Sequence, residues 1–290
     1  MNITVAFQGE LGAYSELAAR EFFDHAIEVR PTSTFAGVFD VVTTGECLYG
    51  IIPIENSLTG SIHQNYDLLL QYDLLIVGEI KLRISHSLIV NRGIRLEEVK
   101  RVYSHPQALA QCDVFIASLG NVEAVPVYDT AGAAKMIKEQ DIRDGAAIAS
   151  AQAAVNYDLE ILARGIETDH QNSTRFLLLS RTGVEHPVNA KTSIVYTLPH
   201  VPGSLFKSLS VFALREINLM KIESRPLRQG KLWEYLFYLD FEGGCDDERC
   251  AHVLEELKET VVSVRVLGSY SKGQETEERV LMRRSAGDPL

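Results

Sequence analysis

The sequence is poor in the residues that mark disulfide-rich, membrane-spanning or secreted proteins. It holds four cysteines in 290 residues, and their scattered positions predict reduced thiols in a cytoplasmic protein rather than a disulfide framework. No apolar run approaches 18 residues, so we expect no membrane span. The first residues lack a basic stretch followed by a long apolar one, so we expect no signal peptide.

Basic residues and metal-ligand spacings are also scarce. The chain carries 28 Lys and Arg against 39 Asp and Glu, a net charge of −11 at pH 7 without a basic patch. This argues against nucleic acid as a partner, and an anionic ligand must be held by local donors. Cys245, Cys250 and His252 have no second pair at zinc-site spacing. We therefore predict a surface loop there and no metal.

The chain does contain a regular alternation of short apolar runs and amphipathic stretches up to about residue 182. Ile3–Phe7, Gly50–Pro53 and Ala146–Ala149 are among the expected strands, and Ser15–Phe23 and Pro106–Leu119 are among the expected helices. Such alternation is typical of α/β layers with largely parallel sheets. We expect residues 1–182 to form the first domain.

A different order follows a linker expected at residues 183–190. The apolar pattern over 191–270 predicts strand, helix, strand, strand, helix and strand, with the third strand over Trp233–Phe241. This is the ferredoxin-like βαββαβ order. Residues 271–290 are expected to be a polar, frayed tail.

Three segments of the first domain share one design, in which a strand ends in small or polar residues before an expected helix. They are Gln8–Ser15, Pro53–Ser61 and Asp129–Ala133. A helix N-terminus offers free N–H groups to an anion, although each segment alone is more often an ordinary cap. His105, before Pro106, is likewise either an acid–base group or a cap.

A fourth segment, Asn172–Phe176, places a hydroxyl, a cation and an aromatic ring on consecutive residues before an apolar strand. Arg175 is either exposed at a strand edge or buried against an anion, because a buried unpaired charge is costly. Together with the three other segments, Thr174 and Arg175 predict a pocket for a small polyanion.

These motifs, taken in order, resemble those of the prephenate dehydratase family along nearly the whole chain. The matching segments of the first domain are Gly9–Ser15, Ile52–Ser57, Ser104–Leu109, Thr130–Gly132 and Asn172–Phe176. The second domain resembles the regulatory ACT domain of that family through Gly203–Phe206 and Glu223–Pro226. Met220 departs from this pattern, because a threonine is expected there.

The resemblance implies a two-lobed catalytic domain like that of type 2 periplasmic binding proteins, with a cleft between the lobes, followed by the ACT domain. It implies a cofactor-free carbon–oxygen lyase that converts prephenate to phenylpyruvate in phenylalanine biosynthesis. It also implies L-phenylalanine as an allosteric effector and a homodimer or homotetramer. Two alternatives stay open, namely an arogenate dehydratase and a non-catalytic amino-acid sensor.

The resemblance further assigns roles to residues. Thr174 is the catalytic residue, a hydrogen-bond donor to the departing hydroxyl. Arg175 grips the side-chain carboxylate of the substrate through its planar fork, and Phe176 excludes water. The other expected substrate-binding residues are Asn56, Ser57, Thr130, Ala13, Tyr14 and Ser15. The expected effector-binding residues are Gly203, Ser204, Leu205, Phe206, Glu223, Ser224, Arg225 and Pro226.

Overall fold

A computed structural model describes residues 3–24, 27–227 and 235–277. Its contacts divide the chain into two compact units. The first contains the chain up to Leu68, Ile80–Phe176 and the chain from Gln274 onward, and the second contains Leu69–Glu79 and Leu177–Gly273. The predicted domain boundaries at residues 182, 190 and 270 stay predictions.

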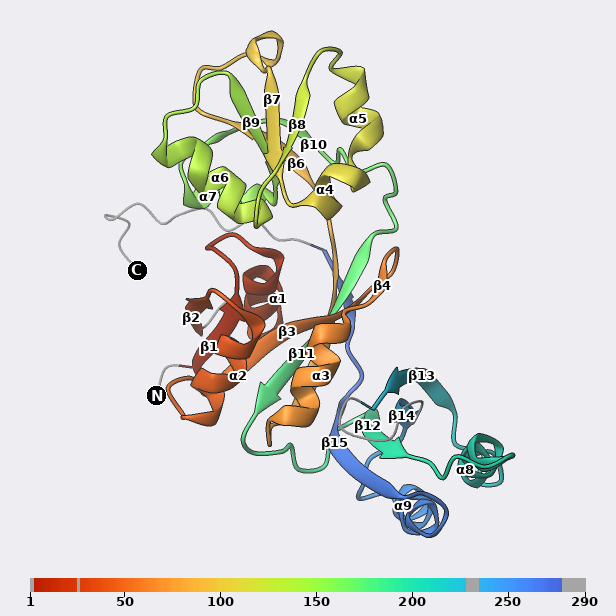
Figure 1. Cartoon of the computed structure of the whole chain (residues 1–290). Helices are drawn as coiled ribbons and strands as arrows, with labels where there is room; N and C mark the ends of the chain where they lie inside the picture. Colours follow the sequence, from red (N-terminus) through yellow and green to blue (C-terminus); the bar gives the residue numbers. More distant parts are fainter. Residues whose placement is uncertain (1–2, 25–26, 228–234, 278–290) are drawn as a thin grey trace. The chain divides into compact units, whose positions relative to one another are not determined.

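One sheet, most of whose residues belong to the first unit, has the strand order β16-β5-β11-β3-β1-β2, and β4 pairs with β3. Strand β1, next to the edge strand β2, runs parallel to β2 and β3, and Val5, Phe7 and Ile51 on these strands are fully buried. The strands are β1 (Ile3–Gln8), β2 (Ile27–Thr32), β3 (Tyr49–Asn56), β4 (Gly60–Ser61), β5 (Leu75–Arg83), β11 (Ser173–Ser180) and β16 (Glu275–Thr276). Figure 1 shows this sheet with the helices α1 (Tyr14–Phe22), α2 (Phe35–Thr43) and α3 (His63–Gln71).

The second sheet of this unit has the strand order β10-β6-β9-β7-β8. Its strands are β6 (Ser87–Val90), β7 (Arg101–Ser104), β8 (Glu123–Pro126), β9 (Gly145–Ala149) and β10 (Glu160–Arg164). All five residues of β9 are buried, because helices cover this strand. The 3-10 turn Leu96–Glu98 precedes β7, and the helices are α4 (Pro106–Gln111), α5 (Asp113–Ser118), α6 (Thr130–Glu139) and α7 (Ala151–Asn156).

Two short segments connect the two sheets. The chain passes from β5 to β6 through residues 84–86 and returns from β10 to β11 through residues 165–172. The two segments are hydrogen-bonded to each other, since Ile84 N donates to Asn172 O at 2.8 Å and Ile166 N donates to His86 O at 3.1 Å. Residues on these segments are therefore held between the two sheets.

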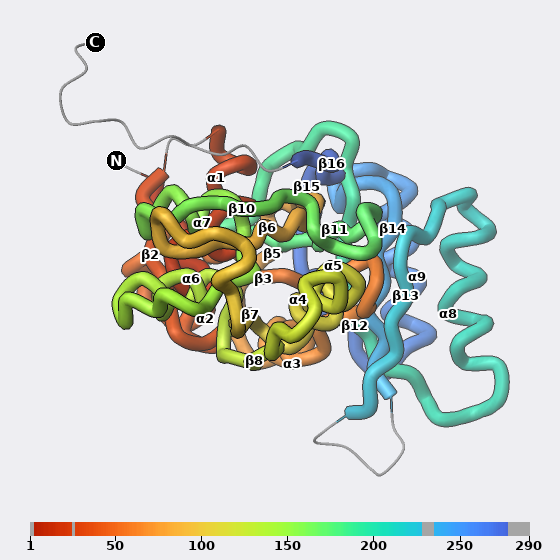
Figure 2. The backbone as a smooth tube through the Cα atoms, turned by 90° about the horizontal axis from the view of Figure 1, so that it is seen from above, coloured from red at the N-terminus to blue at the C-terminus, as the bar shows by residue number. Residues whose placement is uncertain are grey.

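The second unit contains a four-stranded antiparallel sheet with the order β13-β14-β12-β15. Its elements are β12 (Ala190–Thr197), α8 (Ser204–Ala213), β13 (Leu219–Pro226), β14 (Tyr235–Glu242), α9 (Glu248–Thr260) and β15 (Ser263–Ser271). Both helices pack on one face of the sheet, where Tyr196, Phe212, Phe241 and Leu257 share a core (Figures 1 and 2). The predicted βαββαβ order is therefore the observed one.

Some local expectations need correction. The helix expected over Pro106–Leu119 is two helices that meet at Cys112. Cys250 is a buried residue of α9 rather than part of a surface loop. Glu275 and Thr276 of the expected frayed tail pair with β5 as β16. The start of the strand expected over Trp233–Phe241 and the tail beyond residue 277 lie outside the described residues.

Candidate active site

The first unit contains a cavity of about 340 Å³ between residues of its two sheets and their loops. Segments far apart in the sequence meet there, from the loop after β1, the end of β3, the start of α6 and the start of β11. Seven of the residues predicted for the substrate site line it, namely Ala13, Tyr14, Ser15, Asn56, Thr130, Thr174 and Phe176.

Thr174 is held in this cavity by Asn56. The Asn56 side-chain nitrogen donates to the Thr174 hydroxyl oxygen at 3.0 Å and to Asn172 Oδ1 at 2.7 Å. The side-chain oxygen Oδ1 of Asn56 accepts from the backbone N–H groups of Leu58 and Thr59, and these bonds fix the orientation of the Asn56 amide. Because Asn56 donates to Thr174, the hydroxyl hydrogen of Thr174 is left to donate elsewhere, and it reaches no acceptor among the described residues.

Arg175 faces away from the cavity that Thr174 and Phe176 line. Successive side chains of a strand point to opposite faces, so residue 175 on β11 must lie on the other side from residues 174 and 176. Arg175 and Ser57 instead line a separate depression of about 750 Å³ in the same unit. There, Arg175 Nη1 lies 4.0 Å from Glu55 Oε2. The structure thus does not place Arg175 in the cavity that Thr174 lines. This corrects the expectation that Thr174 and Arg175 form one pocket.

Ser57 joins two strands rather than lining the cavity. Its hydroxyl donates to Gln171 O at 3.0 Å and accepts from Ser173 N at 2.9 Å. The segment Pro53–Ser61 is also not a strand followed directly by a helix, because β3 turns back into β4 as an antiparallel hairpin. It therefore offers no helix N-terminus, and this expectation is corrected.

The loop before α1 is packed tightly against α7. Gly12 has a φ of 91°, and a Cβ built on it would lie 2.6 Å from Ala153 Cα. Its N–H donates to Glu16 Oε2 at 2.7 Å. The carboxylate of Glu16 therefore already accepts from this amide, and Tyr14 and Ser15 of the first turn of α1 line the cavity.

The start of α6 likewise carries its own anion. Asp129 Oδ1 accepts from Ala131 N at 3.1 Å as the N-cap, and its Oδ2 accepts from Glu10 N at 3.0 Å. Burial raises the pKa of the Asp129 carboxyl above its ordinary value, and these two backbone hydrogen bonds oppose the rise. The segment Asp129–Ala133, expected to bind an anion, thus presents a carboxylate to the cavity.

His86 is a cavity residue without a signal in the sequence pattern. It lies on the segment between the sheets and is 2% exposed. Its Nδ1 lies 3.0 Å from the Tyr14 hydroxyl and its Nε2 lies 3.0 Å from Gln111 Oε1. Burial lowers the pKa of His86, so the ring is neutral at neutral pH. His86 therefore positions Tyr14 by hydrogen bonding rather than by charge.

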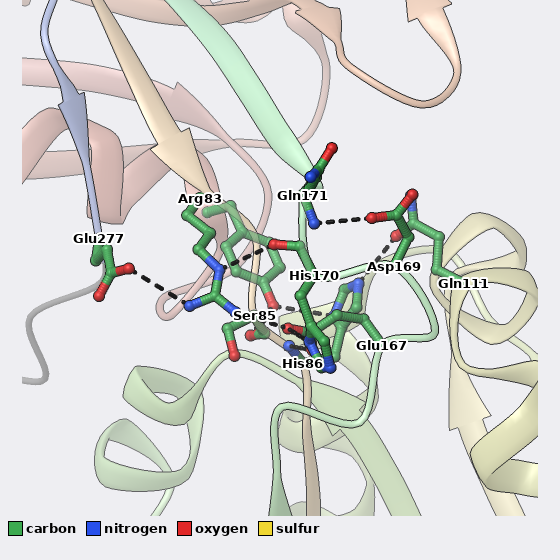
Figure 3. A network of polar contacts seen from close by, with 10 residues as sticks. Arg83, Ser85, His86, Gln111, Glu167, Asp169, His170, Gln171 and Glu277 are labelled. Atoms are coloured by element: carbon green, nitrogen blue, oxygen red, sulfur yellow. Dashed lines mark hydrogen bonds and ion pairs between the residues drawn. The ribbon is translucent and has the colours of Figure 1, made fainter.

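The polar contacts of His86 extend through Glu167 to Arg83 and Glu277, which line the separate depression (Figure 3). Glu167 accepts from His86 N at 2.8 Å, and Arg83 lies 3.6 Å from Glu167 and 3.5 Å from Glu277. Tyr14 in turn donates to Ser85 O at 2.7 Å. This network fixes the segment that presents His86 to the cavity.

His105 acts as a cap in this structure. Its Nδ1 accepts from Gln107 N at 3.2 Å, and Gln107 Nε2 donates to Thr59 Oγ1 at 3.0 Å. Both His105 and Gln107 line the cavity. His105 is therefore the N-cap of α4, and it also lines the cavity.

The second unit has a smaller depression of about 150 Å³ beside the start of α8. Ser204 and Leu205 of the expected effector site line it, whereas Phe206 is 76% exposed. Gly203 precedes α8 with a φ of 83°. Glu223–Pro226 lies on β13, where Ser224 pairs with Phe237 and Pro226 pairs with Tyr235. Phe237 and Tyr235 both line the depression.

The fold and the cavity together indicate which class of protein this is. A two-lobed α/β unit holds a polar cavity with an oriented hydroxyl, and a βαββαβ unit follows it. The family model "Prephenate dehydratase" matches residues 5–184, and the chain belongs to the prephenate dehydratase family.

Relatives agree with this assignment. The chain is 49% identical over 278 residues to arogenate dehydratase/prephenate dehydratase 2, chloroplastic, of Arabidopsis thaliana, covering 92% of this chain and 72% of that protein. The prephenate dehydratase of Arthrobacter aurescens in complex with L-Phe has a TM-score of 0.85 at 33% identity, over 93% and 90% of the two chains. GqqA, described as a quorum-quenching acylase, has a TM-score of 0.86 at 34% identity, over 93% and 98%. The predicted two-lobed α/β fold class is confirmed.

Proposed function

We propose that this protein catalyses the decarboxylating dehydration of prephenate, or of its amino counterpart arogenate, to an aromatic product in phenylalanine biosynthesis. The observation that carries the proposal is the Thr174 hydroxyl, oriented by Asn56 and directed into the cavity. The names of the relatives support both substrates.

The chemistry requires a hydroxyl and a ring carboxylate to leave together. The ring C–CO₂⁻ bond breaks, its electron pair moves into the ring, and the opposite C–OH bond breaks, so that carbon dioxide, the aromatic ring and hydroxide form; the hydroxide takes a proton from the solvent and leaves as water. The departing oxygen gathers negative charge and needs a donor beside it. Thr174 supplies this hydrogen bond, Phe176 borders the ring, and Asn56 keeps the hydroxyl pointed at the leaving group.

The carboxylates of the substrate are held by neutral donors. Tyr14 and Ser15 at the start of α1 line the cavity together with Thr130 and Gln107. A helix N-terminus stabilises an anion through its free N–H groups and its dipole. Arg175 lies on the opposite face of β11, beside Glu55, and in this proposal it does not bind the substrate.

An acylase activity, suggested by the description of GqqA, fits the cavity less well. An acyl-transfer site needs a nucleophilic hydroxyl hydrogen-bonded to a general base. Among the described residues, no Ser or Thr hydroxyl is hydrogen-bonded to His86 or His105, and the Thr130 hydroxyl contacts the Asp129 carboxylate only at 3.4 Å. The lyase therefore remains the function that the site supports best.

The second unit is proposed to be an ACT domain that binds L-phenylalanine as an inhibitor. The support is its βαββαβ order, the depression beside Ser204 and Leu205, and the relative crystallised with L-Phe. The proposed binding residues are those of the two motifs at Gly203–Phe206 and Glu223–Pro226. A homodimer or homotetramer is part of the same proposal.

One assay tests both the proposed activity and the proposed inhibition by phenylalanine. Purified protein is given prephenate or arogenate, with and without added L-phenylalanine, and turnover is measured as carbon dioxide release, with the product identified as phenylpyruvate or phenylalanine in the reactions without added effector. The proposal predicts turnover that falls as phenylalanine is added, and Ser224→Ala and Glu223→Gln variants that keep the turnover but lose the inhibition. Glu255→Gln on the exposed face of α9 is the control. Turnover of neither substrate would favour the amino-acid sensor, and unchanged inhibition in both variants would remove the effector assignment.

The place of the protein in the cell is a separate question. Within the described residues, no helix has the length and apolar character needed to cross a membrane. The Arabidopsis relative is named chloroplastic, so the cytoplasmic location expected from the cysteines stays a prediction.

A further inference from the structure

The charges around the cavity differ from those expected for a site that binds two carboxylates. Among the described residues that line it, Asp129 is the only carboxylate, and none is lysine or arginine. The nearby Lys135 is bound to Glu10 at 3.1 Å, and Arg175 lies on the other face of β11. Prephenate would bring two carboxylates to a fixed negative charge without a compensating cation, whereas arogenate brings an ammonium group together with its two carboxylates.

Asp129 lies beside the N-terminus of α1. The position that a Cβ on Gly9 would take is 2.8 Å from Asp129 Oδ2 and 3.1 Å from Ala13 Cβ. Ala13 is the N-cap of α1. A carboxylate acceptor therefore adjoins a helix end that favours anions. An α-amino acid carries its ammonium and carboxylate on one carbon, and such a pair of neighbouring receptors matches both groups.

The Asp129 carboxylate has capacity left for a ligand. Its Oδ2 accepts one backbone hydrogen bond, from Glu10, and its Oδ1 accepts from Ala131 and, at 3.4 Å, from Thr130. A carboxylate offers about four acceptor positions. The carboxyl has a raised pKa because it is buried and because Glu10 lies near. An ammonium group at this place would compensate the charge that burial leaves uncompensated.

We propose that Asp129 is a specificity-determining residue that binds the ammonium group of the substrate, so that the enzyme prefers arogenate to prephenate. This inference rests on the proposed dehydratase function. The α-carboxylate binds at the start of α1, and the ammonium donates to Asp129. Prephenate has a keto group in place of the ammonium and leaves Asp129 without its cation.

The test is the ratio of kcat/KM for arogenate to kcat/KM for prephenate. We expect the wild-type ratio to be at least about tenfold, because a site that hydrogen-bonds a substrate N–H rejects the analogue without it. Asp129→Asn and Asp129→Ser both keep an N-cap side chain but remove the charge. Each should lower the ratio by at least about tenfold, and damage to the fold alone would lower both rates and leave the ratio unchanged.

Asp247→Asn is the matched control. Asp247 is the N-cap of α9 in the second unit, and it accepts from Arg249 N and Cys250 N. Its ratio should equal that of the wild type. A wild-type preference for prephenate, or an unchanged ratio in the active Asp129 variants, would overturn the role of Asp129. Wild-type protein that consumes neither substrate would instead overturn the dehydratase function on which this role rests.

Discussion

The side-chain nitrogen of Asn56 lies 3.0 Å from the hydroxyl oxygen of Thr174, across 118 residues of sequence. This contact decides which way the threonine hydroxyl can donate. A hydroxyl has one hydrogen to give, and since Asn56 already donates to its oxygen, that hydrogen is left to donate to a ligand in the cavity that Thr174 lines. The catalytic role proposed for Thr174 therefore depends on Asn56 as a positioning residue.

The first prediction concerns Asn56→Asp. The carboxylate can still accept from Leu58 N and Thr59 N, but it cannot donate to Thr174. The threonine would then donate to the aspartate instead of to the leaving group. We expect kcat to fall by about 10- to 100-fold with a smaller change in KM. Steady-state kinetics check this, and a change confined to KM would contradict the positioning role.

The second prediction concerns pH. Burial holds the pKa of His86 below its ordinary value of 6.5. Below this pH the unfolded chain binds a proton that the folded protein does not, so the stability contributed by neutral His86 is full above about pH 6.5 and is lost as the pH falls. His86→Gln should therefore weaken the fall in the free energy of unfolding between about pH 7.5 and 5.5.

Urea denaturation at several pH values measures this dependence. His252→Gln is the control, since His252 is an exposed residue of α9. It should leave the pH dependence of the wild type in place. The same slope in His86→Gln as in the wild type would show that His86 does not stay neutral in the folded protein.

The third prediction concerns the close approach at Gly12. A Cβ there would lie 2.6 Å from the backbone of Ala153, whereas a Cβ on Gly93, at a similar positive φ of 80°, meets nothing within 4 Å. Gly93→Ala should cost about 1 kcal/mol from backbone strain alone. Gly12→Ala should cost about 2 kcal/mol more, because α7 must move. Equal losses in denaturant unfolding would contradict the tight packing.

The fourth prediction concerns a buried ion cluster of the second unit. Lys191 Nζ lies 2.9 Å from Glu79 Oε2 and 3.2 Å from Asp240 Oδ2, and all three side chains are less than 10% exposed. Lys191→Met leaves two buried carboxylates without their cation. We expect a loss of about 3–5 kcal/mol in the free energy of unfolding.

The exposed pair of Arg30 and Glu46 supplies the comparison. Arg30→Met should leave the unfolding free energy nearly unchanged, because water screens this pair. Equal effects in the two variants would mean that the cluster around Lys191 does not contribute through its burial.

Local signals in the sequence predict several elements close to their observed bounds. The strands expected over Ile3–Phe7 and Ala146–Ala149 are observed, each one residue longer, as β1 (Ile3–Gln8) and β9 (Gly145–Ala149). Both have a clear cause, since each is a short apolar run. In contrast, β5 was missed. Its nine residues include Glu79, Lys81 and Arg83, which interrupt an apolar pattern. Glu79 and Arg83 form ion pairs with residues distant in the sequence, and the local pattern does not reveal those partners.

The motifs of the site could be predicted from the sequence, but the direction in which each side chain points could not. The motif around Thr174 correctly marked the cavity, yet the alternation of β11 places Arg175 on the opposite face. His86 could not be found from sequence, because its partner Tyr14 lies 72 residues away. The role of Asp129 was hidden in the same way, since a capping aspartate looks the same whether or not it also faces a ligand.

The measurement that tests the account most directly is kcat for Thr174→Ser and Thr174→Val with the better of the two substrates. Serine keeps the hydroxyl, while valine keeps the shape without a donor. We predict that Thr174→Ser stays within about tenfold of the wild type and that Thr174→Val loses at least about 100-fold, with both variants folded. Near wild-type turnover in Thr174→Val would contradict the claim that this hydroxyl stabilises the departing oxygen.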